Sequence, residues 1–210
     1  MHPPKAVLLV HGAGSGPWVF DGWAEHFPGT VVHAVDLQQG LRVEAATMSL
    51  YAGTIVAEAG RLPFPLMICA WSMGGLAALM AAGTVRPELL VLLEPSPPAE
   101  VQGTHVEVQP TPGSFDPEHV YGPFPPGVRV RPESSLARDE RRRGISVPSV
   151  PCPVLVVSSA EFAEGRGHAV ARLYRGDELS FPDVRHFGMV LDPRVPRAIA
   201  RYVAGRIREA

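Results

Sequence analysis

The sequence predicts an α/β fold in which about six mostly parallel strands carry helices on both faces. Short apolar runs alternate with helix-like segments along the chain, which is the pattern of a parallel sheet covered by helices. The runs are continuously apolar rather than alternating, as expected of strands that are buried on both faces. The chain has 210 residues, of which 46% are hydrophobic and 19% are charged, so we expect one domain, residues 1–210, with a substantial core.

Each candidate strand is an apolar run that ends at turn or polar residues. The six runs are residues 6–10 (AVLLV), 31–35 (VVHAV), 66–70 (LMICA), 89–93 (LLVLL), 154–157 (VLVV) and, more weakly, 178–181 (ELSF). Helix-like segments lie between or after them at residues 20–27, 45–59, 75–82, 132–143 and 194–207. In parallel sheets, functional sites lie outside the carboxyl ends of the strands. The candidates for a site are therefore the polar residues that follow predicted strands: His11, Ser72, Glu94, Glu161 and His186.

The segment 95–131 departs from this alternation. It contains PSPP, PTPG and YGPFPPG and shows no periodicity. Proline removes a backbone donor and fixes φ, so we expect neither a strand nor a long helix here. The segment is too long to be an ordinary connection. We interpret it as a short proline-rich lid over the strand ends; a surface loop without a role is the alternative.

The stretch CAWSMGGL, residues 69–76, is the strongest functional motif. Ser72 lies two residues from Ala70 and two from Gly74, which fits the G-x-S-x-G nucleophile elbow with alanine in place of the first glycine. Small neighbours are needed because the serine occupies a strained turn that pushes its hydroxyl outward. The following helix N-terminus brings the N–H of Met73 and a positive partial charge beside that hydroxyl. We therefore predict Ser72 as a nucleophile and Met73 N–H as an oxyanion donor.

The pair His11-Gly12 follows the first predicted strand. A glycine there lets the backbone curl so that the N–H of Ala13 faces the same hydroxyl, which would supply a second oxyanion donor. We interpret His11 itself as a structural histidine that holds the loop. A phosphate-binding loop is not indicated, because no GK[ST] follows.

His186 follows the last predicted strand in the stretch DVRHFGMVLDP. A histidine late in the chain, in a loop at the strand ends, is placed to act as the general base for Ser72. The other histidines are terminal, precede the elbow, fall in the proline-rich segment or lie on a surface helix: His2, His26, His33, His105, His119 and His168.

In this order the pieces resemble the α/β-hydrolase family over nearly the whole chain. The matching stretches are VLLVHGAG, CAWSMGG, LLVLLEPSPP, PCPVLVVSSAEF and RHFGMVLDP. The resemblance implies the α/β-hydrolase fold in a minimal version, because Lys5 leads directly into the first strand and the usual N-terminal antiparallel strand pair is absent.

The acid of the expected triad is where the chain departs from the family. Members commonly end the penultimate strand with G-x-x-Asp, and here Phe162 occupies the place of the aspartate. A hydrophobic side chain cannot orient an imidazole, so we expect Glu161, one residue earlier, to act as the acid. Glu94 is the alternative, because some members carry the acid after the strand that follows the elbow helix. Glu164 and Asp183 are weaker candidates.

The resemblance implies an esterase or thioesterase that acts on a small acyl substrate through an acyl-enzyme on Ser72. Trp71, Trp18 and Phe162 are candidates for lining the acyl pocket. The same residues could serve acyl transfer, perhydrolysis or lyase chemistry, because fold does not fix reaction. A degenerate hydrolase that binds a small molecule without turnover is the alternative of a different class, suggested by Phe162 in the acid position.

Composition limits the partners. The net charge of −2 gives no reason to expect nucleic acid. No apolar stretch is long enough to span a membrane, and no signal peptide is indicated, so we expect a cytoplasmic protein without a membrane partner. Cys69 and Cys152 are expected to be reduced thiols. No motif for a metal or organic cofactor is present, and none is expected.

Overall fold

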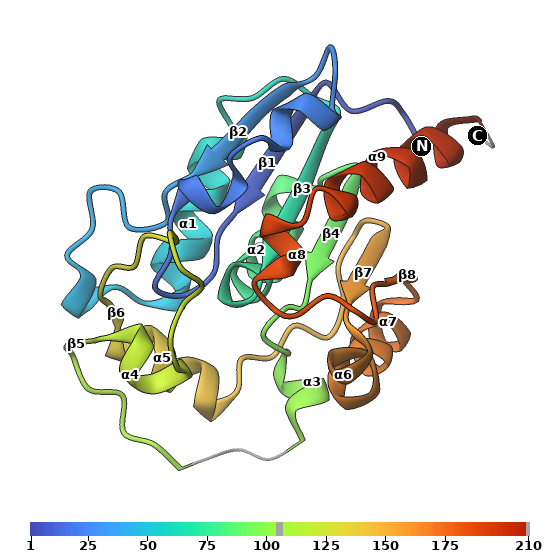
Figure 1. The fold of residues 1–210 in the computed structure, drawn as a ribbon. Coiled ribbons are helices and arrows are strands. Elements are labelled where there is room, and N and C mark those ends of the chain that lie inside the picture. The colour runs from blue at the N-terminus through green and yellow to red at the C-terminus, as the bar shows by residue number, and fades with distance from the viewer. Residues whose placement is uncertain (104–106, 209–210) are drawn as a thin grey trace.

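The structure is a computed structural model that describes residues 1–103 and 107–208. At its centre lies a six-stranded sheet of order β2-β1-β3-β4-β7-β8 (Figure 1). Its strands are β1 (Ala6–Val10), β2 (Val31–Val35), β3 (Leu66–Trp71), β4 (Leu89–Leu93), β7 (Val154–Ser158) and β8 (Asp177–Ser180). All neighbouring strands pair in parallel. The predicted six-stranded, mostly parallel sheet is confirmed, and β8 begins one residue earlier than expected.

The strand order reverses direction next to β1. The chain passes from β1 to β2 at one edge, and β3, β4, β7 and β8 then follow on the other side of β1. In open α/β sheets, ligands bind in the crevice at such a reversal, outside the carboxyl ends of the strands. The two strands that flank this reversal, β1 and β3, are the ones that lead into His11-Gly12 and Ser72.

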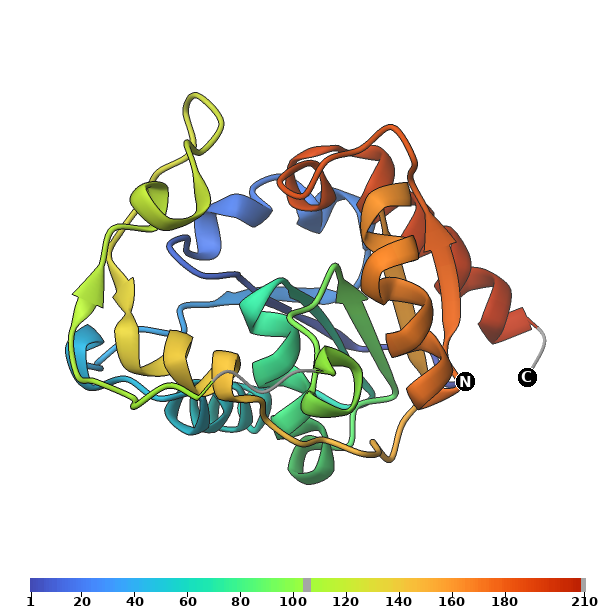
Figure 2. The same cartoon turned by 90° about the horizontal axis from the view of Figure 1, so that it is seen from below.

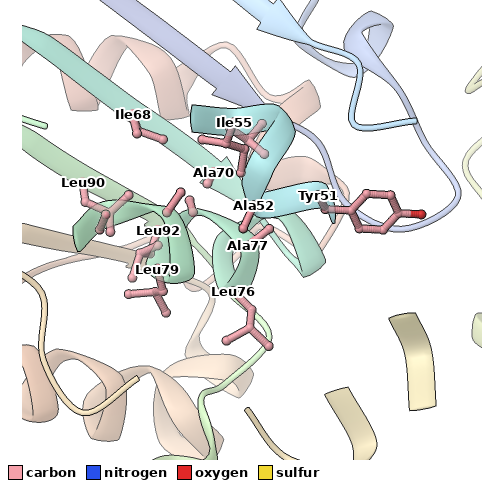
Figure 3. Close-up of a cluster of buried hydrophobic side chains, with 14 of the residues drawn as sticks. Tyr51, Ala52, Ile55, Ile68, Ala70, Leu76, Ala77, Leu79, Leu90 and Leu92 are labelled. Carbon is pink, nitrogen blue, oxygen red and sulfur yellow. The ribbon is translucent and has the colours of Figure 1, made fainter. Parts of the chain in front are cut away.

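Helices cover both faces of the sheet (Figures 1 and 2). The helices are α1 (Met48–Ala59), α2 (Met73–Val85) and α7 (His168–Tyr174) on one face, and η1 (Pro17–Phe20), η2 (Trp23–His26), α8 (Gly188–Leu191) and α9 (Arg194–Arg208) on the other. Ile68 and Leu90 face the first layer, where Figure 3 shows them in the core cluster with α1 and α2. Cys69 and Val91 face the second layer. Since both sets are fully buried, the strands need apolar residues at every position.

Two predicted helices start differently from expectation. Residues 20–27 form parts of two short 3-10 turns, η1 and η2, instead of one helix, because Gly22 has a left-handed φ of 82° between them. The helix predicted from residue 45 begins at Met48. Thr47 sets this start, since its hydroxyl accepts the N–H of Leu50 at 3.1 Å. These differences are local and leave the layers unchanged.

Between β4 and β7 the described part of the chain leaves the sheet, and its helices and short strands lie toward the lower end of the molecule in Figure 1. Its elements are α3 (Ala99–Gln102), β5 (Ser114–Phe115), α4 (Pro117–Tyr121), β6 (Glu133–Ser134) and α5 (Ser135–Arg143). We name the described part of residues 95–143 the lid segment. The expectation that residues 95–131 contain no strand is wrong at β5, which pairs antiparallel with β6. His105, one of the competing histidines, lies outside the described residues.

The helix predicted at 132–143 begins three residues later as α5. Its first residues form β6, and the hydroxyl of Ser134 then accepts the N–H of Ala137 at 3.1 Å, which caps the helix. The same hydroxyl donates to the carbonyl of Ala46 at 2.6 Å. One serine therefore ends the strand, starts the helix and ties the lid segment to the chain before α1.

Two further features bear on the expected cellular location of the protein: the length of its helices and the state of its cysteines. In the part of the chain that the structure describes, every helix is too short or too polar to cross a bilayer. Cys69 and Cys152 are both free. Burial raises the pKa of both thiols, that of Cys152 to about 11, so both stay protonated at neutral pH.

Candidate active site

Ser72 occupies a sharp turn between β3 and α2. Its backbone lies at φ 54° and ψ −123°, a conformation that residues other than glycine rarely adopt. Its N–H donates to the carbonyl of Leu93 at 3.0 Å, and its own carbonyl accepts the N–H of Ser96 at 2.8 Å. Strain of this kind costs about 1–3 kcal/mol and persists only where neighbouring structure enforces it. Here the end of β4 enforces it, in agreement with the predicted nucleophile elbow.

Gly74, two residues after the serine, must be a glycine because the loop that follows β1 lies against it. A Cβ atom added at Gly74 would lie 2.3 Å from the carbonyl oxygen of His11. A Cβ atom added at Gly12 would lie 2.9 Å from the Cβ of Ser72. We name residues 11–16, which follow β1, the β1 loop. This loop and the elbow therefore touch backbone to backbone, and a side chain larger than that of glycine at either contact would push them apart.

This close approach concerns the two residues expected to donate to an oxyanion, Ala13 and Met73. Met73 is the first residue of α2, directly after Ser72. Ala13 lines the same pocket as Ser72, and its N–H has no acceptor within the described residues. A helix N-terminus and an unpaired backbone N–H are the kinds of group from which oxyanion holes are built, so the arrangement is compatible with the predicted role.

His186 pairs with Glu94. Nδ1 of the histidine lies 2.6 Å from Oε2 of the glutamate. Oε1 of Glu94 accepts the N–H of Ser159 at 2.8 Å. The side chain of Glu94 is 3% exposed and that of His186 is 43% exposed. Because Nδ1 donates to the carboxylate, the neutral ring has its second nitrogen, Nε2, free to accept a proton.

The electrostatics keep Glu94 ionised. Burial by itself opposes ionisation of its carboxyl group, but the hydrogen bonds from His186 and Ser159 outweigh burial and hold the pKa of Glu94 below its usual value. Glu94 also has a positive φ of 42°. The residue after β3 and the residue after β4 are thus both held in strained backbone conformations at one site.

The structure brings Glu94, and not Glu161, to His186. Ser159 follows β7 and caps α6 (Ala160–Phe162), since its hydroxyl accepts the N–H of Phe162 at 3.3 Å. The helix begins at once and leaves Glu161 exposed. Glu161 lines a larger cavity of about 800 Å³ beside His186 that does not include Ser72. The structure therefore places the alternative carboxylate, Glu94, against His186 in place of the expected Glu161, because β4 lies next to β3 in the sheet and ends beside the elbow.

Trp71 holds the loop that carries His186. Its indole N–H donates to the carbonyl of His186 at 3.1 Å, and the two rings lie 4.9 Å apart between centroids. The sequence suggested only a pocket-lining role for this residue. Trp71 does line the pocket, and its hydrogen bond also fixes the backbone of the histidine.

Trp18 does not line the pocket with Ser72. Its indole N–H donates to the carbonyl of Arg129 at 2.9 Å, and the guanidinium of Arg129 stacks 4.8 Å from its ring centroid. The loop at Gly16 directs it there, because Trp18 packs so closely that a Cβ on Gly16 would lie 2.3 Å from the ring. The expected pocket residue is therefore a contact between the β1 loop and the lid segment.

His11 is fully buried and holds the β1 loop. Its Nδ1 lies 2.8 Å from the carbonyl of Gly12, and its Nε2 accepts the N–H of Leu37 at 3.1 Å. A carbonyl accepts and a backbone N–H donates, so this pattern fits the neutral ring with the proton on Nδ1. The geometry agrees with the structural interpretation of His11.

Two charged residues of the lid segment clamp the same loop. Arg131 donates from Nε to the carbonyl of Ser15 at 2.8 Å and forms a two-pronged ion pair with Asp36 at 3.0 and 2.5 Å. Glu133 is fully buried and accepts the N–H of Gly14 at 3.1 Å. No sequence motif indicated this clamp, because it depends on pairing across the fold.

A pocket of about 310 Å³ lies at the strand ends, and Ser72 is among the residues that line it. Six of the residues predicted for the site line it: Ala13, Trp71, Ser72, Glu94, Phe162 and His186. Phe124 and Phe187, which the sequence did not single out, complete its apolar wall with rings 4.5 Å apart. The volume suits a small ligand.

Comparisons with known proteins add the following. No model of a protein family matches the sequence, and no curated protein matches it. A methylesterase from Arabidopsis superposes with a TM-score of 0.68 at 17% identity, over 98% of this chain and 99% of that chain. A pyrethroid hydrolase from Sphingobium faniae gives 0.71 at 16% identity, over 97% and 99%. Methylketone synthase I of tomato, in complex with 2-tridecanone, gives 0.67 at 19% identity, over 97% and 99%.

Proposed function

The chain has the α/β-hydrolase fold, and on this premise we propose that it is a serine hydrolase that cleaves a small carboxylic ester through an acyl-enzyme on Ser72. The observation that carries the proposal is the hydrogen bond between Glu94 and His186, in the pocket that Ser72 also lines. A strained serine in one pocket with a histidine that a buried carboxylate orients is the set of groups that a nucleophilic hydrolase uses.

The proposed reaction uses each group once per half-reaction. Ser72 attacks the ester carbonyl while Nε2 of His186 takes its proton. The N–H groups of Ala13 and Met73 bind the oxyanion of the tetrahedral intermediate. His186 returns the proton to the leaving alcohol, which leaves the acyl group on Ser72. Water, deprotonated by His186, then attacks the acyl-enzyme and releases the acid.

Glu94 acts on the reaction through His186. Its carboxylate fixes the ring with the proton on Nδ1 and stabilises the imidazolium that forms during attack. The Ser159 N–H keeps the carboxylate in place and supports its ionised form. Trp71 fixes the backbone of the histidine loop at the same time.

Several observations support an ester as the substrate. The pocket of about 310 Å³ has an apolar wall that fits a short acyl chain. Two of the similar structures are a methylesterase and a pyrethroid hydrolase. A thioester would use the same groups, so parallel assays with matched oxygen and thiol esters decide between the two. Acyl transfer, perhydrolysis and lyase chemistry differ in their products, which mass analysis identifies.

A binding protein without turnover is the second candidate. It was suggested by Phe162 in the usual place of the acid. Glu94 weakens this argument for a binding protein, because it supplies a carboxylate to His186 from the end of another strand. Saturable ligand binding without any product from oxygen or thiol esters would favour this second candidate.

The test is turnover of p-nitrophenyl acetate and butyrate by wild type, Ser72→Ala and His186→Gln. Ser49→Ala is the matched control, because Ser49 is exposed on α1 and distant in the fold from the elbow. We expect kcat to fall by a factor on the order of 10⁴ or more in the first two variants and to stay at the wild-type value in the control. Turnover that survives in Ser72→Ala would contradict the proposal.

We also propose that the protein works in the cytoplasm with a small-molecule acyl substrate as its partner. The free thiols of Cys69 and Cys152 support a reducing compartment. Fractionation of cells that express the protein at its natural level tests the location.

A further inference from the structure

The pocket of Ser72 continues on one side into a second depression of about 320 Å³. The two hollows share Ser96, Tyr121, Arg141 and Arg166. Two more arginines line the second hollow, and no carboxylate is among its lining residues. We name this surface the arginine wall: Arg138, Arg141, Arg142 and Arg166. It comes from α5 of the lid segment and from the turn η4 (Ala163–Gly167) that follows α6.

Two of the four arginines in the arginine wall share one carboxylate partner. Asp139 lies 3.9 Å from Arg138 and 3.5 Å from Arg142. Arg138 also stacks on the ring of Phe115, 5.5 Å from its centroid. These two arginines therefore have partners inside the lid segment, and their presence in the wall has a structural explanation.

Arg141 and Arg166, the two that reach the pocket of Ser72, have no carboxylate partner within the described residues. Arg141 donates only to neutral groups, the hydroxyls of Ser96 at 3.2 Å and Tyr121 at 3.1 Å. Within the described residues its Nε–H is buried and has no acceptor. Buried donors are nearly always paired in folded proteins, so this guanidinium has hydrogen-bonding capacity that the described residues do not satisfy.

The positive charge is a local property of this pocket. The whole chain carries a net charge of −2, so a generally basic surface does not account for it. The hollows are small, about 310 and 320 Å³, which favours a small anionic molecule over a polymer. Guanidinium groups bind carboxylates through paired N–H donors in a planar fork.

We propose that Arg141 and Arg166 bind a carboxylate on the substrate, so that the preferred ester is anionic at a group away from the scissile bond. This inference rests on the proposed function, because it assigns the substrate class of the same pocket. The carboxylate supplies the counter-charge that both arginines lack within the described residues. The neutral acyl part then lies along the apolar wall toward Ser72.

The experiment compares matched anionic and neutral esters. One pair places the charge on the acyl side: monomethyl glutarate against its terminal amide. The other pair places it on the leaving group: the acetate ester of para-hydroxybenzoate against that of para-hydroxybenzamide. We expect wild type to prefer the anionic member of one pair by about tenfold or more in kcat/KM, which is the usual size for charge-assisted hydrogen bonds. The pair that shows the preference identifies the side that carries the charge.

The variants Arg141→Gln and Arg166→Gln are each expected to reduce this ratio about tenfold, and Arg141→Lys is expected to keep part of it. Arg201→Gln is the matched control, because Arg201 is exposed on α9 and its loss changes the net charge by the same amount. The control is expected to keep the wild-type ratio. A ratio near one in wild type, or one that neither pocket variant changes, would overturn the inference.

Direct binding separates this inference from the proposed function. Calorimetry of monomethyl glutarate and of the para-hydroxybenzoate ester with Ser72→Ala requires no turnover. We expect the anionic ester to bind and its neutral amide to bind about tenfold more weakly, with the difference lost in the double variant Ser72→Ala, Arg141→Gln. Equal binding of both would overturn the inference even in an active hydrolase. Selective binding without turnover in wild type would retain the arginine site and contradict the hydrolase.

Discussion

Nδ1 of His186 lies 2.6 Å from Oε2 of Glu94, although the two residues are 92 positions apart in the chain. The pair forms because β4 lies next to β3, so that the residue after β4 sits beside the elbow that follows β3. A carboxylate at this strand end can orient the histidine without any contribution from the residue in the family's more common acid position.

Glu94→Gln tests the role of this carboxylate. The amide keeps the shape but cannot stabilise the imidazolium, so we expect kcat to fall by about 10²–10⁴-fold with KM little changed. Glu161→Gln is the control and is expected to keep wild-type kcat, because Glu161 is exposed and does not line the pocket that contains Ser72. The opposite ranking of the two variants in steady-state kinetics would return the acid role to Glu161.

The same pair makes stability depend on pH. Since the pKa of Glu94 in the folded protein is lowered from 4.5, its ionised form contributes stability above that value, and the contribution is lost as the pH falls through the lowered pKa. We expect the difference in the free energy of unfolding between wild type and Glu94→Gln to shrink as the pH falls below 4.5. Urea unfolding over this range measures it, and a difference that grows toward acid would be inconsistent with the pairing.

Gly74→Ala tests the contact between the elbow and the β1 loop. Its Cβ would lie 2.3 Å from the carbonyl oxygen of His11, so the loop must move. We expect a loss of about 1–3 kcal/mol in stability and a lower kcat, because the Ala13 N–H moves with the loop. Gly83→Ala in the same helix is the control, since nothing lies within 4 Å of its added Cβ. It is expected to gain about 0.5–1 kcal/mol from helix propensity.

Glu133→Gln tests the clamp from the lid segment. Its carboxylate accepts the Tyr51 hydroxyl at 2.5 Å and the Gly14 N–H at 3.1 Å, and an amide can no longer accept from both sides. We expect a loss of about 1–3 kcal/mol in stability. We also expect kcat to fall more than KM changes, because Glu133 holds the β1 loop that carries the Ala13 N–H and does not line the Ser72 pocket. Glu44→Gln, exposed before α1, is the control. Unchanged kcat in a destabilised Glu133→Gln would restrict the clamp to a structural role.

The strands of the sheet could be predicted because the signal for each strand lies within a few consecutive residues of the sequence. Strands such as β1, β3 and β4 are buried on both faces, and their uninterrupted apolar runs record that burial. The elbow could also be predicted, since the sharp turn and close contacts of Ser72 demand small residues at fixed positions nearby. The catalytic roles of Ser72 and His186 remain predictions, although the structure places both side chains at one pocket.

The carboxylate partner could not be ranked correctly from sequence. Glu94 and Glu161 both follow predicted strands, and the choice depends on which strand end lies nearer the elbow and on where α6 begins. The clamp of Arg131 and Glu133 gave no signal at all, because its partners on the β1 loop are more than 100 positions away. Such contacts follow from the path of residues 95–131, a stretch whose sequence has no periodicity from which that path could be predicted.

The central claim is that Ser72 is an activated nucleophile. Intact-protein mass spectrometry after treatment with a fluorophosphonate probe tests it most directly, followed by peptide mapping. The proposed mechanism predicts one phosphonyl adduct on wild type, located on Ser72, no adduct on Ser72→Ala, and slower labelling of Glu94→Gln. Folded wild type that takes up no probe, or an adduct that persists in Ser72→Ala, would contradict it.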